Sequence, residues 1–125
     1  MRNIALLGST GSIGTNTLEV IAQNREEFNL IGIAAGENIR RLEEQVRVFS
    51  PAIVAVKHRG DAEALKKTFP GQRVVYGSAG LLELIADPRV DTMVSAIDGT
   101  TALEATLESI KRNHRICLAN KETLV

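Results

Sequence analysis

The sequence is poor in aromatic side chains and carries no net charge. Its 125 residues include no tryptophan, and the aromatic residues are Phe28, Phe49, Phe69 and Tyr76. So few and so scattered rings exclude a platform on which nucleic acid bases stack. Fifteen basic side chains balance fifteen acidic ones, so no overall field draws the protein to nucleic acid or to an anionic membrane. We therefore expect no nucleic acid and no membrane among its partners.

Cysteine and long apolar runs are also scarce. Cys117 is the only cysteine, which excludes an intrachain disulfide, and its apolar neighbours predict a small buried side chain in a reducing compartment. No stretch approaches the roughly 18 apolar residues of a membrane span, and a short strand directly after Met1–Asn3 does not match a signal peptide. We expect a cytoplasmic domain.

Several signatures of catalytic sites are missing. No group of His, Cys, Asp or Glu has the spacing of metal ligands, and the sequence has neither a G-x-S-x-G elbow nor a P-loop lysine. His58 and His114 stand among polar residues and are expected at the surface. These residues predict no metal site.

The sequence does contain a regular alternation of strand-like and helix-like segments. Short apolar runs at 4–7, 30–35, 53–56, 73–76, 92–97 and 115–118 are separated by stretches with helical periodicity. Strands that are apolar throughout are typical of a parallel sheet covered on both faces. Right-handed crossovers then give a doubly wound, mainly parallel open sheet, a Rossmann-like α/β fold with helices on both faces. We expect residues 1–125 to form one such domain.

The clearest amphipathic helix follows the fifth strand. Its apolar positions recur at helical spacing and are expected to form its packed face: Leu103, Thr106, Leu107 and Ile110. At the end of the chain, Asn120 is a candidate helix N-cap, but only one turn would follow it. One turn is not stable alone, so we expect this chain to be the front portion of a longer protein.

The most informative motif is the glycine loop, Gly8–Gly14, between the first strand and a helix. Its G-x-x-G-x-x-G spacing is one residue longer than the common dinucleotide fingerprint. We expect Gly8 to permit a tight turn, Gly11 to let phosphates approach the backbone, and Gly14 to let the helix pack close to the strand. The helix N-terminus would then bind a pyrophosphate. The alternative is a plain strand-to-helix turn.

Two further polar segments follow strands, where ligands of parallel sheets bind. After the second strand, Glu37 favours the free ribose of NAD, whereas Arg40 and Arg41 favour a 2′-phosphate or are simply solvated. After the sixth strand, 120–122 places an amide, an ammonium and a carboxylate side by side. These groups could hold a cofactor and a phosphorylated or enediolate-like substrate, or merely cap a helix.

Together these segments resemble a known family. The glycine loop with Thr17-Leu18 after it, Ala34–Gly36, Phe49–Pro51 and above all Leu118–Val125 are closely similar to 1-deoxy-D-xylulose 5-phosphate reductoisomerase. The resemblance runs along the whole chain and corresponds to the N-terminal NADPH-binding domain of that enzyme. It implies contacts to the pyrophosphate and adenosine of NADPH within the glycine loop, from Thr10, Gly11, Ser12 and Ile13.

The same resemblance implies roles for two other segments. Gly36, Glu37 and Asn38 would surround the 2′-phosphate of NADPH. Asn120 and Glu122 would meet the nicotinamide half of the cofactor, and Lys121 would bind the phosphorylated sugar.

The family rearranges the carbon skeleton of 1-deoxy-D-xylulose 5-phosphate and reduces the resulting aldehyde with NADPH. The product is 2-C-methyl-D-erythritol 4-phosphate, used in isoprenoid synthesis, and the enzyme is a homodimer that needs Mg²⁺ or Mn²⁺. The metal ligands of the family would lie beyond Val125. We therefore expect these residues to bind cofactor, to contain no catalytic residue and to leave the reaction incomplete.

Three positions depart from the family pattern. Glu37 stands where the family often has a basic residue, Asp98 where a small or apolar residue is more usual, and Ala102 where glycine is common. Two oxidoreductase families are alternatives, those of aspartate-semialdehyde dehydrogenase and dihydrodipicolinate reductase, as is a non-catalytic dinucleotide-sensing domain. The 120–122 segment favours the reductoisomerase, and Cys117 inside a strand is poorly placed as a dehydrogenase nucleophile.

Overall fold

The structure is a computed structural model that describes residues 1–97 and 99–118. Strands and helices alternate along these residues: β1 (Arg2–Leu7), α1 (Ser12–Gln23), β2 (Phe28–Ala35), α2 (Ile39–Phe49), β3 (Ile53–Val56), α3 (Arg59–Thr68), β4 (Arg73–Tyr76), α4 (Gly77–Ile85), β5 (Thr92–Ser95), α5 (Gly99–Lys111) and β6 (Arg115–Leu118). No helix within the described part of the chain is long and apolar enough to cross a membrane.

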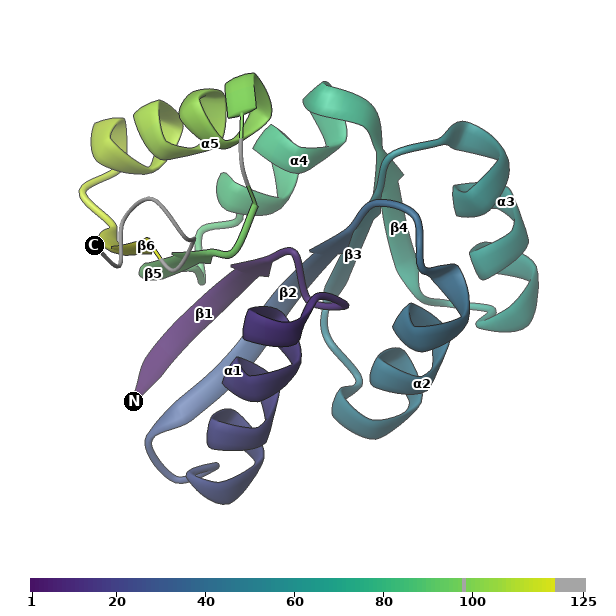
Figure 1. Ribbon diagram of the computed structural model, residues 1–125, viewed down its shortest axis with the longest axis horizontal. Helices are drawn as coiled ribbons and strands as arrows, with labels where there is room; N and C mark the ends of the chain where they lie inside the picture. Colours follow the sequence, from purple (N-terminus) through teal and green to yellow (C-terminus); the bar gives the residue numbers. More distant parts are fainter. Residues whose placement is uncertain (98, 119–125) are drawn as a thin grey trace.

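The strands pair in parallel in the order β4-β3-β2-β1-β5-β6. From β1 the chain first moves stepwise to β4, then crosses back to β5 on the other side of β1. Because each crossover is right-handed, this reversal places α1, α2 and α3 on one face and α4 and α5 on the other, as Figure 1 shows. The predicted doubly wound, Rossmann-like α/β fold is confirmed.

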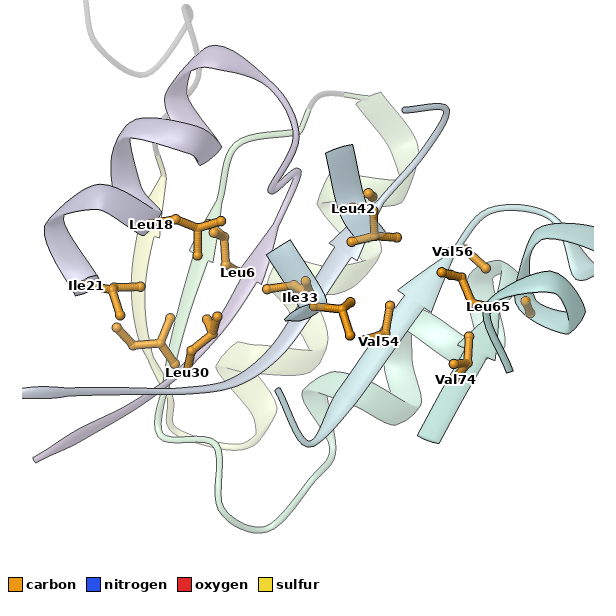
Figure 2. Close-up of a cluster of buried hydrophobic side chains, with 14 residues drawn as sticks. Leu6, Leu18, Ile21, Leu30, Ile33, Leu42, Val54, Val56, Leu65 and Val74 are labelled. Atoms are coloured by element: carbon orange, nitrogen blue, oxygen red, sulfur yellow. The ribbon is translucent and has the colours of Figure 1, made fainter. Parts of the chain in front are cut away.

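Each face of the sheet has its own apolar layer. On one face, Leu18 of α1, Leu42 of α2 and Leu65 of α3 pack against strand residues that include Ile33 (Figure 2). On the other face, α4 contributes most of the helical side chains. Because the inner strands are covered by an apolar layer on both faces, their residues are apolar on both sides, which explains their continuous apolar runs.

The packed face of α5 differs from the prediction. Leu103, Leu107 and Ile110 are more than half exposed, whereas Ala105 and Ser109 are fully buried. The helix thus lies against the molecule through its small side chains. Helical periodicity identifies an apolar stripe but does not show whether another element covers it.

The expected burial of Cys117 is also wrong, because its side chain is exposed. The residue lies on β6, which forms one edge of the sheet. In the described residues, β6 pairs with β5 alone. An edge strand of this kind keeps the apolar sequence of an inner strand but not its burial.

Asp87, between α4 and β5, is a buried carboxylate that depends on one arginine. Arg89 donates to it from the backbone N at 2.9 Å, from Nε at 2.9 Å and from Nη2 at 2.7 Å. The hydrogen bond from the Arg89 side chain is the main cause that lowers the pKa of Asp87 from 3.8 to about 2, and burial opposes it. Folding therefore favours the ionised carboxylate.

We expect Asp87→Asn to lower the free energy of unfolding by on the order of 1–2 kcal/mol at pH 7. Because the pKa is lower in the folded state, the unfolded chain binds more protons as the pH falls from about 4 towards 2. The difference in free energy of unfolding between the two proteins should therefore have its full size above pH ~5 and should shrink as the pH falls from about 4 to 2. Urea unfolding at several pH values measures it. Glu63→Gln, which removes an exposed charge 3.3 Å from Arg59, is the control and should change stability by at most ~0.5 kcal/mol.

Candidate functional site

The glycine loop lies where the strand order reverses. β1 has β2 on one side and β5 on the other. The N–H groups of Gly8 and Ser9 donate to the carbonyl of Ala34 at 2.8 and 3.1 Å, and the N–H of Ala96 donates to Leu7 at 2.8 Å. The first two bonds tie the loop to the end of β2, and the third ties the last residue of β1, directly before the loop, to the residue that follows β5. Ligands of open parallel sheets bind at this kind of crevice.

Gly8 and Gly14 occupy positions that a larger residue would not fit. Gly8 has a φ of +86°, and a Cβ there would lie 2.8 Å from the carbonyl oxygen of Ala96. At Gly14, on the first turn of α1, a Cβ would overlap the carbonyl oxygen of Gly8. The first glycine therefore permits the turn and the third lets α1 start directly against the loop.

The N-terminus of α1 is open to an anion. Its N-cap, Gly11, has no side chain to cover the free N–H groups, and the first turn contains no acidic residue. Gly11 and Ser12 are exposed, while Thr10 and Ile13 are half-buried. The unpaired N–H groups of the first turn and the positive end of the helix dipole both face outward from the N-terminus of α1. This arrangement suits a phosphate or pyrophosphate.

A hydrogen bond from α2 fixes the glycine loop. The buried Gln45 donates from Nε2 to the carbonyl of Ser9 at 2.8 Å. Ser9 itself is fully buried, and its hydroxyl has no hydrogen-bond partner among the described residues. The loop is thus held by hydrogen bonds to β2 and to α2.

A pocket of about 380 Å³ opens beside the loop at the carboxyl ends of the strands. Its wall includes the residues that directly follow the first three strands, Gly8 after β1, Gly36 after β2 and Lys57 after β3. Ser78 of α4 and Ile97, which follows β5, also line it. This volume lies within the range of small-molecule and cofactor sites, about 300–1,000 Å³. Most of its lining is apolar or backbone, which suits a planar base beside a more polar sugar phosphate.

Glu37 lies at the end of β2, beside two basic residues from the end of β3. Its Oε1 is 3.6 Å from Lys57 Nζ and 3.6 Å from His58 Nε2. The neighbouring Asn38 caps α2, since its Oδ1 accepts from the backbone N–H of Arg41 at 3.2 Å. Glu37 and Asn38 therefore already have partners within the protein.

Three predicted site residues, Asn120, Lys121 and Glu122, lie outside the described residues, as does Asp98, one of the departures from the family pattern. In the ranges that are described, no three His, Cys, Asp or Glu side chains form a group that could hold a metal ion.

Sequence reasoning missed part of the pocket wall. Lys57, after β3, and Gly77 and Ser78, after β4, line the pocket but were not among the predicted residues. Their positions in the sequence could have indicated them, because each follows a predicted strand and the carboxyl ends of all strands in a parallel sheet lie at one edge. Applying that rule to all the strands would have found them.

The reversed strand order, the glycine loop and the pocket beside it define a Rossmann-like dinucleotide-binding domain. The family model described as 1-deoxy-D-xylulose 5-phosphate reductoisomerase matches residues 4–125. The chain belongs to that family.

Individual relatives agree with this assignment. The 1-deoxy-D-xylulose 5-phosphate reductoisomerase of Protochlamydia amoebophila is 46% identical over 125 residues, which are 100% of this chain and 33% of that protein. The reductoisomerase of Desulfitobacterium hafniense is 43% identical over 127 residues, again with 100% and 33% coverage. The chain therefore spans about a third of the length of these relatives.

Solved structures match the fold closely. The Zymomonas mobilis reductoisomerase in complex with NADPH has a TM-score of 0.86 at 30% identity, over 98% of this chain and 33% of its own. A DOX-P reductoisomerase in complex with magnesium has a TM-score of 0.89 at 30% identity, over 99% and 32%. The two other oxidoreductase families considered above are thus set aside.

Proposed function

We propose that this chain is the NADPH-binding part of a 1-deoxy-D-xylulose 5-phosphate reductoisomerase. The observation that carries the proposal is the glycine loop at the strand reversal, with the open N-terminus of α1 above it and the pocket beside it. The residues fit a dinucleotide, because Gly8 and Gly14 let α1 start directly against the loop and the N-cap Gly11 leaves the free N–H groups of that helix uncovered. NADPH, when bound, supplies the hydride of the reaction.

The described residues would divide the work of holding the cofactor. Thr10, Gly11, Ser12 and Ile13 would receive the pyrophosphate at the start of α1. Gly36 and Asn38 would lie beside the adenosine ribose, at the end of β2. Their task is to bind and orient the cofactor, and the donors there are mainly backbone N–H groups.

The remaining parts of the proposal rest on the family. The longer enzyme would isomerise and reduce 1-deoxy-D-xylulose 5-phosphate to 2-C-methyl-D-erythritol 4-phosphate, with Lys121 on the phosphorylated sugar and Asn120 and Glu122 near the nicotinamide. A divalent metal would be held by residues outside this chain. The enzyme would act as a homodimer in the cytoplasm, without nucleic acid or membrane as a partner. Residues 1–125 alone would form a cofactor-binding domain without reductoisomerase activity.

Ser12→Asp tests the proposed pyrophosphate site. Ser12 is the exposed first residue of α1, so a carboxylate there would sit where the pyrophosphate should bind and repel it. We expect the affinities for NADPH and for NADH both to fall about tenfold or more, measured by nucleotide fluorescence or calorimetry. Thermal stability should not fall, because an acid on the first turn favours the helix dipole by about 0.3–1 kcal/mol.

The matched control is Ser12→Asn, which has the same size without the charge and should bind both nucleotides much as the parent does. If Ser12→Asp binds NADPH as tightly as the parent, the glycine loop is a structural turn and the pyrophosphate lies elsewhere. A parent chain that binds neither nucleotide would contradict the proposal itself.

A further inference from the structure

Glu37 creates an electrostatic conflict in a site that is proposed to bind NADPH. A carboxylate at the end of the second strand normally accepts from the ribose hydroxyls of NADH and repels a 2′-phosphate. The side chain of Glu37 is 74% exposed and stands directly after Gly36, which lines the pocket. Something in this chain has to offset its charge if the phosphorylated cofactor is to bind.

The parallel pairing of β2 and β3 supplies that charge. Ala35 is the register partner of Val56, so the residues that follow the two strands emerge side by side. Lys57 Nζ and His58 Nε2 both lie 3.6 Å from Glu37 Oε1. The Lys57 side chain is 65% exposed, which leaves its ammonium group free to exchange one anionic partner for another.

Lys57 is also better placed than the arginines of α2. Arg40 and Arg41 lie exposed on the first turn of that helix, and neither is among the described residues that line the pocket. Lys57 lines the pocket together with Gly36. A phosphate group on a ribose bound beside Gly36 would therefore lie within reach of the Lys57 ammonium group.

We infer that Lys57 is a specificity-determining residue of this site, which binds the 2′-phosphate of NADPH in exchange for its ion pair with Glu37. The inference rests on the proposed function. Glu37 is then the anion that occupies Lys57 when no cofactor is bound, and it is not a ligand of the ribose hydroxyls. His58 Nε2, 3.6 Å from Glu37 Oε1, remains beside the carboxylate after Lys57 has moved to the phosphate.

The competing explanation is an ordinary surface ion pair, which contributes little to anything. Four proteins separate the two explanations: the parent chain, Lys57→Gln, Glu37→Gln and the control Lys67→Gln. Lys67 is exposed on the last turn of α3, at the far end of that helix from Lys57, and its replacement removes the same charge. Each protein is titrated with NADPH and with NADH by nucleotide fluorescence or calorimetry, and its thermal unfolding is recorded.

We expect Lys57→Gln to weaken NADPH binding by about tenfold or more, with NADH binding changed by less than about twofold. Glu37→Gln should strengthen NADPH binding by about threefold or more, because it removes a like charge from the phosphate site. Lys67→Gln should change neither affinity. All four proteins should unfold at similar temperatures, since the side chains concerned are exposed.

Two results would overturn the inference while the proposed function stands. One is a Lys57→Gln protein that keeps the parent's affinity for NADPH. The other is a Glu37→Gln protein that loses about tenfold in affinity for NADH, since Glu37 would then hold the ribose hydroxyls. A parent chain that binds neither nucleotide overturns the proposed function and this inference together.

Discussion

Gly14→Ala should destabilise the fold and abolish NADPH binding. A Cβ at this position overlaps the carbonyl oxygen of Gly8 and lies 2.8 Å from the backbone C and Cα of Ser9. These are backbone atoms, so no side chain can rotate away and either the loop or α1 has to move. We expect the free energy of unfolding to fall by on the order of 3 kcal/mol or more.

The loss of binding has a separate cause. The loop is fixed through Ser9, whose N–H donates to Ala34 at 3.1 Å and whose carbonyl accepts from Gln45 at 2.8 Å. A methyl group on Gly14 collides with the backbone of Gly8 and Ser9, so we expect it to disrupt this anchorage and to move the N–H groups of α1 away from the pyrophosphate position. Urea unfolding measures the first effect, and nucleotide titration measures the second in whatever fraction remains folded.

Gly60→Ala is the matched control for this substitution. Gly60 is the second residue of α3, and a Cβ there meets no atom within 4 Å. Alanine is the better helix former by up to ~1 kcal/mol, so this variant should be as stable as the parent or more stable, with unchanged binding. If the free energy of unfolding of Gly14→Ala stays within ~0.5 kcal/mol of the parent, the backbone of Gly8 and Ser9 does not exclude a side chain at position 14.

The fold could be predicted from the sequence because its main signals are local. Each strand is a short apolar run, each crossover is long enough for a helix, and handedness then fixes the faces of a parallel sheet. The glycine loop could be located for the same reason, since turn, close approach and helix start are all encoded within Gly8–Gly14. Strands that are apolar throughout are also what an apolar layer on each face of the sheet requires.

What could not be predicted depends on contacts between distant residues. Leu103, Leu107 and Ile110 form a stripe with the period of a buried face, yet α5 packs through Ala105 and Ser109. Periodicity orients a helix relative to an apolar environment without showing which elements supply it. The exposure of Cys117 has the same origin, because a strand does not encode whether it lies at the edge of the sheet.

The environment of Glu37 is a second example. The sequence showed an acid among arginines and pointed both ways on cofactor choice. Lys57 and His58 are about twenty residues further along the chain, and only the pairing of β2 with β3 brings them to the carboxylate. Charge balance at this edge of the sheet is a property of the register, which sequence spacing alone does not give.

Gly32 and Leu84 should show strong coupling in a double-mutant cycle. Gly32 lies on β2, and a Cβ there would be 2.9 Å from Cγ and 3.0 Å from Cδ2 of Leu84, a fully buried residue of α4. Leu84 thus fills the space above the glycine. Leu84→Ala should lower stability by about 2–5 kcal/mol because it leaves a cavity, and Gly32→Ala by about 1–3 kcal/mol because it overpacks the site.

In the double variant, the new methyl group of residue 32 enters the space that Leu84 has left. We expect Gly32→Ala to be neutral or stabilising in the Leu84→Ala background, so the two effects together should fall short of their sum by about 1 kcal/mol or more. Urea unfolding of the four proteins measures this coupling. Leu65→Ala is the control partner, because Leu65 is equally buried but lies in the apolar layer on the opposite face of the sheet.

Gly32→Ala and Leu65→Ala should therefore add within ~0.5 kcal/mol, as substitutions without shared contacts do. Additivity of Gly32→Ala with Leu84→Ala would instead mean that α4 shifts to relieve either change alone. Such a shift would also reach the pocket, since Gly77, Ser78 and Leu81 of α4 line it. Nucleotide affinity of the Gly32→Ala protein then distinguishes the two cases: it stays near that of the parent if Leu84 yields locally, and it falls if the whole helix moves.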